Sequence, residues 1–335
     1  MSFKKDYGFV ICVDHHYILA VQALINSIIK FNMHKYADVI LLYSGFDPYE
    51  MFSVDNLNLK CFQVDKRCIH VAHARYLMLE KFAKEYKSLC IMDGDMFFTA
   101  DVRKFFEIAQ YGFNIGCNND STSMYHTCIK NGEGGLCVDN LTSYCTLCNV
   151  PFFFNYNKSF SIWKKYSDLY DVAVTKSDYE LFNYSVFTNS DIIDNLIIYP
   201  SSAFTGVHHT FFKPQTFFRF DLYRDDMVSG DKETILEDCF VVSNDYTRVY
   251  SIHGHYFHPG WVENCISAMR SYYIENGTNQ ERQNHFFNRN RMIMKNLNKI
   301  FLSFVFGGTI SFEQIEQKIN QHQKEYVLKL KNKIL

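Results

Sequence analysis

The stretch 88-SLCIMDGDMFFTAD-101 decides how the rest of the chain is interpreted. Residues 89–92 form an uninterrupted apolar run, which is typical of a central strand covered on both faces. The run ends on Asp93, Gly94 and Asp95. Two carboxylates one residue apart repel each other when they are desolvated, so they need solvent or a cation. Gly94 has no side chain, which lets a ligand approach the backbone closely.

Hard oxygen ligands at such a position suit Mg²⁺ or Mn²⁺, which usually keeps some water and is completed by substrate phosphates. We therefore predict that Asp93 and Asp95 bind Mn²⁺ or Mg²⁺. The other interpretation of an isolated Asp-x-Asp is a polar strand end with a tight turn. The flanking sequence decides between the two.

Predicted strands and helices alternate on both sides of this stretch. The predicted strands are 7–13, 38–43, 59–64, 89–92, 113–117, 150–154 and 248–252. The predicted helices are 17–31, 72–86, 102–109, 160–170 and one that Ser190 caps. Such alternation implies a mainly parallel sheet, whose ligands lie outside the carboxyl ends of the strands. Because Asp14 and the Asp93–Asp95 pair follow two of these strands, we expect them to share one crevice.

Composition excludes several classes of protein. The 335 residues carry 34 Lys and Arg against 36 Asp and Glu, so a net charge of −2 gives no global field for nucleic acid or an anionic membrane. No apolar run approaches the ~18 residues of a membrane span, and no signal peptide is evident. We expect a soluble, intracellular protein, in the host cytoplasm if the source is viral. The 11 cysteines are then read as reduced thiols.

Residues 118–148 are polar and glycine-rich, and we interpret them as an insertion loop. A zinc site is conceivable there, from His126, Cys128, Cys137, Cys145 and Cys148. However, the Cys-x-x-Cys at its end runs into a predicted strand, where residues three apart point to opposite faces. Reduced thiols are the preferred interpretation.

The predicted strand 248–252 ends on His253, and His255 and His258 follow. Imidazoles at a strand end are where a metal or a diphosphate is bound. We favour His253 over His255 as a metal ligand, because His253 directly ends the strand.

Together these segments resemble the GT-A nucleotide-diphosphosugar glycosyltransferases, and family 8 in particular, which is glycogenin-like and galactosyltransferase-like. The resemblance covers about residues 7–261 and rests on the order of FVICVDHHYILAVQALINSI, ARYLMLEKF, CIMDGDMFFTADV, NSDIIDN and IHGHYFHPGW. It implies an α/β, Rossmann-like, mainly parallel sheet flanked by helices. Residues 1–262 would form the catalytic domain, and residues 263–335 a helical extension whose last helix could support oligomerisation.

The resemblance also implies roles for individual residues. Asp93 and Asp95 would hold the divalent cation on the donor diphosphate, with His253 as the third ligand. The nucleotide-sugar site would be formed by Val13, Asp14, Tyr17, Arg75, Asp93, Gly94 and His258. The catalytic or sugar-contacting acid would be Asp191, or alternatively Asp194.

The expected activity is transfer of a sugar from a nucleotide-diphosphosugar, UDP-linked by this resemblance, to an acceptor hydroxyl. The acceptor stays open between a glycan, a protein and hydroxymethylated pyrimidines in phage DNA. One alternative is a nucleotide-sugar-binding protein with weak or no catalysis. Another is a haloacid-dehalogenase-type phosphatase, but Phe97 stands where that class has a small hydroxyl residue.

Overall fold

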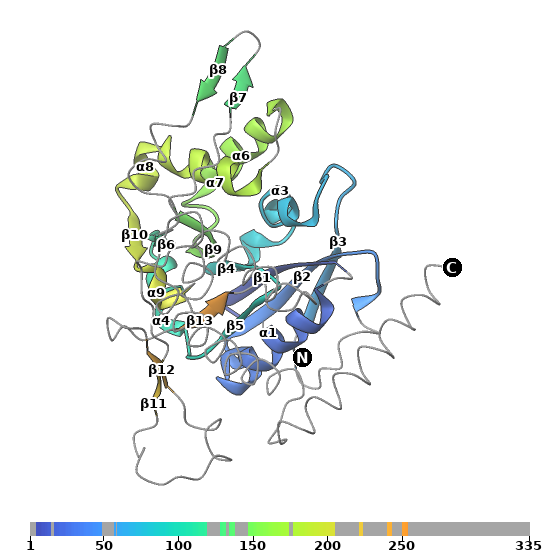
Figure 1. Cartoon of the computed structure of the whole chain (residues 1–335), viewed down its shortest axis with the longest axis vertical. Helices are drawn as coiled ribbons and strands as arrows, with labels where there is room; N and C mark the ends of the chain where they lie inside the picture. The colour runs from blue at the N-terminus through green and yellow to red at the C-terminus, as the bar shows by residue number, and fades with distance from the viewer. Residues whose placement is uncertain are drawn as a thin grey trace, which may run out of the picture.

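A computed structural model gives the structure of the protein (Figure 1). It describes residues 5–14, 17–48, 57, 59–118, 128–131, 134–137, 147–173, 177–204, 221–223, 240–242 and 250–253. The predicted C-terminal helical extension and its role in oligomerisation lie outside these residues, as does His258.

A seven-stranded sheet with the strand order β10-β6-β9-β4-β1-β2-β3 forms the centre of the molecule. Its strands are β1 (Tyr7–Asp14), β2 (Ala37–Ser44), β3 (Leu59–Gln63), β4 (Ser88–Met92), β6 (Asn114–Asn118), β9 (Leu147–Phe154) and β10 (Leu196–Tyr199). All neighbouring pairs are parallel except those of β9, which is antiparallel to both β4 and β6. The predicted mixed, mainly parallel α/β sheet is confirmed.

Helices cover both faces of the sheet, and consecutive residues of β9 separate the two layers. Phe153 packs against Phe105 and Phe106 of α4 (Arg103–Ala109). Its neighbours Phe152 and Phe154 instead contact Trp163 of α6 (Phe160–Val172). This alternation is the period of two that a strand imposes on its side chains. It explains why a continuous run of aromatic residues can be buried on both sides.

The helices near the carboxyl ends of β1 and β4 are short, apart from α1 (Ile18–Lys30). Residues 72–86, predicted as one helix, instead form a series of turns: η2 (Val71–His73), α3 (Ala74–Leu77), η3 (Leu79–Lys81) and η4 (Ala83–Glu85). The backbone leaves helical geometry at Met78 and Phe82, with φ values of −105° and −145°. That prediction of a continuous helix is therefore wrong.

The described residues also form three two-stranded sheets. The predicted insertion loop 118–148 contains a hairpin of β7 (Cys128–Asn131) and β8 (Gly134–Cys137), and its last two residues begin β9. A second pair joins β11 (Asp221–Tyr223) to β12 (Phe240–Val242). The third joins β5 (Met96–Phe98) to β13 (Ser251–His253), which brings a distal segment of the chain to the residues that follow β4.

The remaining elements are η1 (Met33–Lys35), α7 (Asp178–Phe187), α8 (Ser190–Ile193) and α9 (Ser201–Phe204). The predicted cap at Ser190 falls one residue away, since Asn189 is the N-cap of α8. None of the described helices is long and apolar enough to cross a membrane.

Candidate functional site

The candidate site lies where the neighbouring parallel strands β1 and β4 end. Ile11 is in register with Met92. Asp14, the last residue of β1, and Asp93, which follows β4, therefore lie at the carboxyl ends of adjacent strands. The chain leaves β1 toward β2 on one side and returns to β4 on the other. Such a switch in strand order is where open α/β sheets bind ligands.

Gly94 is required by the packing of this turn. A Cβ at residue 94 would lie 2.9 Å from Cγ2 of Val21 on α1 and 3.1 Å from the carbonyl oxygen of Cys12. The turn is therefore pressed against both α1 and the end of β1. This fixes the backbone between Asp93 and Asp95, of which Asp95 is only 4% exposed.

Arg75 is the buried cation of the site. It is 2% exposed, and its guanidinium forms ion pairs with Asp93 through Nη1 and with Asp178 through Nη2. The side-chain amide of Asn149 on β9 donates to the same Asp178 carboxylate at 2.8 Å. Burial alone would lower the pKa of the guanidinium, but the charges of its acidic neighbours outweigh burial and raise it above its ordinary value. One cation thus joins the end of β4 to the start of α7.

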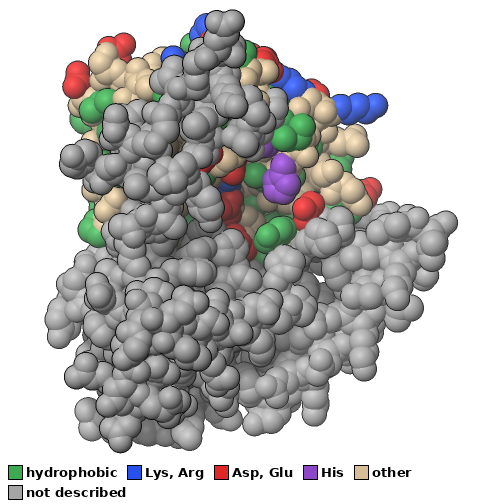
Figure 2. All heavy atoms as spheres, turned by 45° about the horizontal axis from the view of Figure 1, so that its top comes forward, with side chains coloured by type: hydrophobic (Ala, Val, Ile, Leu, Met, Phe, Trp, Pro, Cys, Tyr) green, Lys and Arg blue, Asp and Glu red, His purple; other side chains and the backbone are tan. Residues whose placement is uncertain are grey.

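The pKa values of Tyr17 and Cys12 are raised by the surroundings of Asp93 and Asp95. The pKa of the Tyr17 phenol is raised to about 12, by burial first and then by the charges of Asp95, Asp93 and Asp14. Burial also raises the pKa of the Cys12 thiol to about 12, so this thiol is not a thiolate at neutral pH. Figure 2 shows acidic side chains gathered in the middle of one face, with histidine at the surface beside them.

The structure therefore places five residues of the predicted nucleotide-sugar site near one another, together with the predicted metal ligand Asp95: Asp14, Tyr17, Arg75, Asp93 and Gly94. Val13 precedes Asp14, but its side chain is fully buried, so only its backbone can line a ligand. His253 pairs with Met96 across β13 and β5, which places its backbone beside the residue after Asp95.

Asp191 and Asp194 lie elsewhere. Both are exposed at α8, directly before β10. Strand β10 runs parallel to β6 and hence in the direction of β4, so the residues before it lie at the amino ends of these strands. Asp93 lies at the carboxyl end of β4. The structure thus places the two predicted catalytic acids at the opposite end of the strands from Asp93.

Asp178 and Asn149 are the two site residues that the sequence prediction missed. A local signal for Asp178 existed: Ser177 and Glu180 have capping-box spacing, and Ser177 does accept a hydrogen bond from the Glu180 N–H at 3.4 Å. An acid in the first turn of a helix is nevertheless common without any site. The ion pair with Arg75 is what distinguishes Asp178 from such an acid.

The proposed zinc cluster is only partly described. Cys128 and Cys137 are register partners in the β7–β8 hairpin, and His126 and Cys145 lie outside the described residues. Cys148 is buried and forms no disulfide with another described residue, and the same holds for Cys12 and Cys90. In the described part of the chain, no three His, Cys, Asp or Glu side chains form a metal-binding group.

No protein-family model and no curated protein matches this chain. Solved structures do match. The apo bifunctional glycosyltransferase WbbM aligns with 86% of this chain and 52% of its own, at 13% identity and a TM-score of 0.50. The galactosyltransferase LgtC with donor and acceptor sugar analogues aligns with 79% of this chain and 95% of its own, at 12% identity and 0.48.

The glycosyltransferase GlyE of Streptococcus pneumoniae TIGR4 also matches, with 59% of this chain, 46% of its own, 16% identity and a TM-score of 0.40. The chain thus spans about half the length of WbbM and of GlyE. At such identities, the similarity concerns the fold. The sheet and its helices have the GT-A fold of glycosyltransferases.

Proposed function

We propose that the protein is a metal-dependent glycosyltransferase that moves a sugar from a nucleotide-diphosphosugar, most simply a UDP-sugar, to an acceptor hydroxyl. The observation that carries this proposal is the Asp93-Gly94-Asp95 turn at the carboxyl end of β4, joined through buried Arg75 to Asp178. Its position on a GT-A fold supports the same conclusion.

Asp93 and Asp95 supply carboxylates of the kind that a divalent cation takes, although the described residues group no third His, Cys, Asp or Glu ligand with them. Asp93 and Asp178 pair with the guanidinium of Arg75. The charges of Asp95, Asp93 and Asp14 raise the pKa of the Tyr17 phenol, which places these three carboxylates near one another. Magnesium and manganese accept one or two protein carboxylates together with phosphate oxygens. Asp93 and Asp95 would hold Mn²⁺ or Mg²⁺, with His253 as the third ligand. The ion would offset charge on the departing diphosphate.

The protein's own side chains would position the donor. Tyr17, Asp14 and the backbone of Val13 would line the base and ribose. Asp178 would contact the sugar, because Arg75 and Asn149 fix its carboxylate next to Asp93. In this proposal Asp178 replaces Asp191 and Asp194, which lie across the sheet.

The test compares these acids directly. UDP release from UDP-glucose and UDP-galactose is measured with Mn²⁺ in the wild type and in Asp178→Asn, Asp191→Asn and Asp194→Asn. We expect Asp178→Asn to lower kcat by about 100-fold, equivalent to about 2.7 kcal/mol in the barrier. The other two variants should stay within about twofold of the wild type. The proposed role of Asp178 is wrong if Asp191→Asn is equally impaired.

A further inference from the structure

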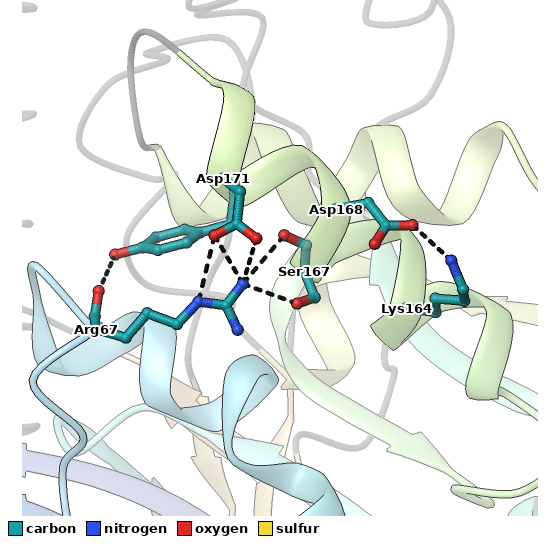
Figure 3. Close-up of polar contacts among 6 residues, drawn as sticks. Arg67, Lys164, Ser167, Asp168 and Asp171 are labelled. Carbon is teal, nitrogen blue, oxygen red and sulfur yellow. Dashed lines mark hydrogen bonds and ion pairs between the residues drawn. The ribbon is translucent and has the colours of Figure 1, made fainter.

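The segment 65–70, which follows β3, is joined to α6 by hydrogen bonds of Arg67 (Figure 3). The Arg67 guanidinium donates to both carboxylate oxygens of Asp171 at 2.7 Å and to the Ser167 hydroxyl at 3.0 Å. The two-oxygen contact is the arrangement in which an arginine–carboxylate pair is best oriented. Arg67 therefore links this segment to α6.

Two tyrosines of α6 contact this segment and the turn η2 that follows it. The Tyr170 hydroxyl donates to the Arg67 carbonyl at 3.0 Å and accepts from the Ile69 N–H at 2.9 Å. The Tyr166 hydroxyl lies 2.7 Å from Nδ1 of buried His73. Ile69 and His70 thus lie between fixed points on both sides, although Ile69 is 68% exposed and His70 is also exposed.

This segment borders the proposed donor site. It leads into η2, which packs against β1 and β2, and Arg75 follows η2 by two residues. Cys68 lies close enough to buried Cys12, next to the site, that a negative charge on Cys68 would raise the pKa of the Cys12 thiol. Ile69 and His70 therefore lie at the rim next to Arg75.

The side chain of His70 has a defined hydrogen-bonding state. Its Nδ1 accepts the Ala72 N–H at 3.2 Å, so the proton of the neutral imidazole resides on Nε2. Nε2–H is a donor suited to a hydroxyl group, and the adjacent Ile69 offers an apolar surface. Together they match a sugar ring, which has apolar C–H faces and hydroxyl edges.

The charges of the segment do not match a polyanion. Arg67 is engaged by Asp171, and Lys81 lies 3.5 Å from Asp65. This leaves Lys66 as the basic residue of segment 65–70 without an ion pair among the described contacts. Binding to nucleic acid relies on several basic contacts to phosphates.

We propose that Ile69 and His70 form an acceptor-binding subsite for a saccharide, with Ile69 under the sugar ring and Nε2–H of His70 donating to a ring hydroxyl. This inference rests on the proposed glycosyltransferase function and specifies its acceptor class. It favours a glycan over modified DNA.

The test uses His70→Asn, Ile69→Ala and the matched control Ile198→Ala. Asparagine keeps a side-chain acceptor for the Ala72 N–H, but its amide nitrogen takes the place of the imidazole Cδ2 and does not reach the position of Nε2–H. Ile198 is a suitable control because it is also an exposed isoleucine, 42% exposed on edge strand β10. Transfer from UDP-glucose and UDP-galactose is measured to lactose, p-nitrophenyl glucoside, p-nitrophenyl galactoside and a 5-hydroxymethylcytosine duplex, and UDP release without acceptor is measured in parallel.

We expect a saccharide to be glycosylated, and each rim variant to raise the acceptor KM about five- to tenfold, as loss of one hydrogen bond or contact predicts. Acceptor-free UDP release and Ile198→Ala should remain within about twofold of the wild type. Transfer to the duplex alone, transfer to no saccharide despite UDP release, or an unchanged acceptor KM overturns the subsite. Absence of both UDP release and UDP binding in the wild type contradicts the proposed function instead.

Discussion

Arg75 is the residue on which the site's electrostatics depend. Its side chain is buried, and the two carboxylates that it joins come from residues 85 positions apart, Asp93 and Asp178. A buried ion pair adds little net stability compared with an apolar replacement of both partners, but removal of one partner leaves uncompensated charge. The site should therefore be sensitive to loss of the cation.

Replacement of Arg75 by methionine should lower the free energy of unfolding by about 3 kcal/mol, because Asp93 and Asp178 then face each other without a cation. Urea denaturation followed by circular dichroism measures this. The control is Lys164→Met, which removes the exposed ion pair with Asp168 and should change stability by less than about 0.5 kcal/mol. Equal effects of the two variants would show that the Arg75 pairs are not important for stability.

Glu180 is the second unusual residue of α7. It is 5% exposed, and neither carboxyl oxygen has a hydrogen-bond partner among the described residues. Burial raises the pKa of this carboxyl to about 7; the nearby Ser177 hydroxyl opposes the shift, and the Asp178 charge adds to it. Because the folded protein holds this proton more tightly than the unfolded chain, it binds more protons between pH 4.5 and about 7.

The free energy of unfolding should therefore fall as pH rises through that window, and Glu180→Gln should remove this fall. We expect the variant to resemble the wild type near pH 4.5 and to be more stable by about 2 to 3 kcal/mol at pH 8. Thermal and urea unfolding at the two pH values provide the test, with exposed Glu107→Gln as the control. A variant that gains nothing at pH 8 would mean that Glu180 is ionised and satisfied in the folded protein.

Among the secondary-structure elements, the turn after β4 has the tightest packing at the site. The turn after β4 packs its Gly94 against Val21 of α1 and the backbone at the end of β1. The backbone carbonyl cannot move as a side chain can. The position of the two aspartates relative to the end of β1 is therefore set by this glycine.

Gly94→Ala should force the turn away from β1, lowering UDP affinity in the presence of Mn²⁺ by about tenfold or more and stability by about 1–3 kcal/mol. The matched control is Gly116→Ala on β6. There a Cβ would meet the side chain of Leu147 at 3.1 Å, which can yield, and the site is not adjacent. Isothermal titration and urea unfolding separate the two effects. Unchanged UDP affinity in Gly94→Ala would contradict the role of this packing.

Elements whose signals are local were predictable from the sequence. Apolar runs and turn residues gave β1, β2, β3 and β4 to within two residues, and periodicity gave α1. The failure at residues 72–86 has a tertiary cause. His73 is bonded to Tyr166 and Arg75 to the two acids, and these contacts hold the chain in short turns although its residues favour a helix.

At the scale of the whole molecule, the order of strands determines which acids meet. The Asp93–Asp95 pair could be predicted because the residues are neighbours in the chain and follow an unmistakable buried strand. Asp178 could not, because its partner is brought close only by the packing of α6 and α7 beside β9. Asp191 has a similar local sequence, but the direction of β10 takes it to the opposite edge of the sheet.

We propose that the carboxyl ends of β1 and β4 bind a nucleoside diphosphate together with a divalent cation. Isothermal titration of UDP into the wild type and Asp95→Asn, each with and without Mn²⁺, tests it most directly, with exposed Asp168→Asn as the control. In the wild type and the control, Mn²⁺ should raise UDP affinity at least about tenfold, because the phosphates and Asp95 share the ion. In Asp95→Asn this gain should disappear. A wild type that binds UDP equally well without Mn²⁺, or an Asp95→Asn variant that keeps the full gain, would contradict the account.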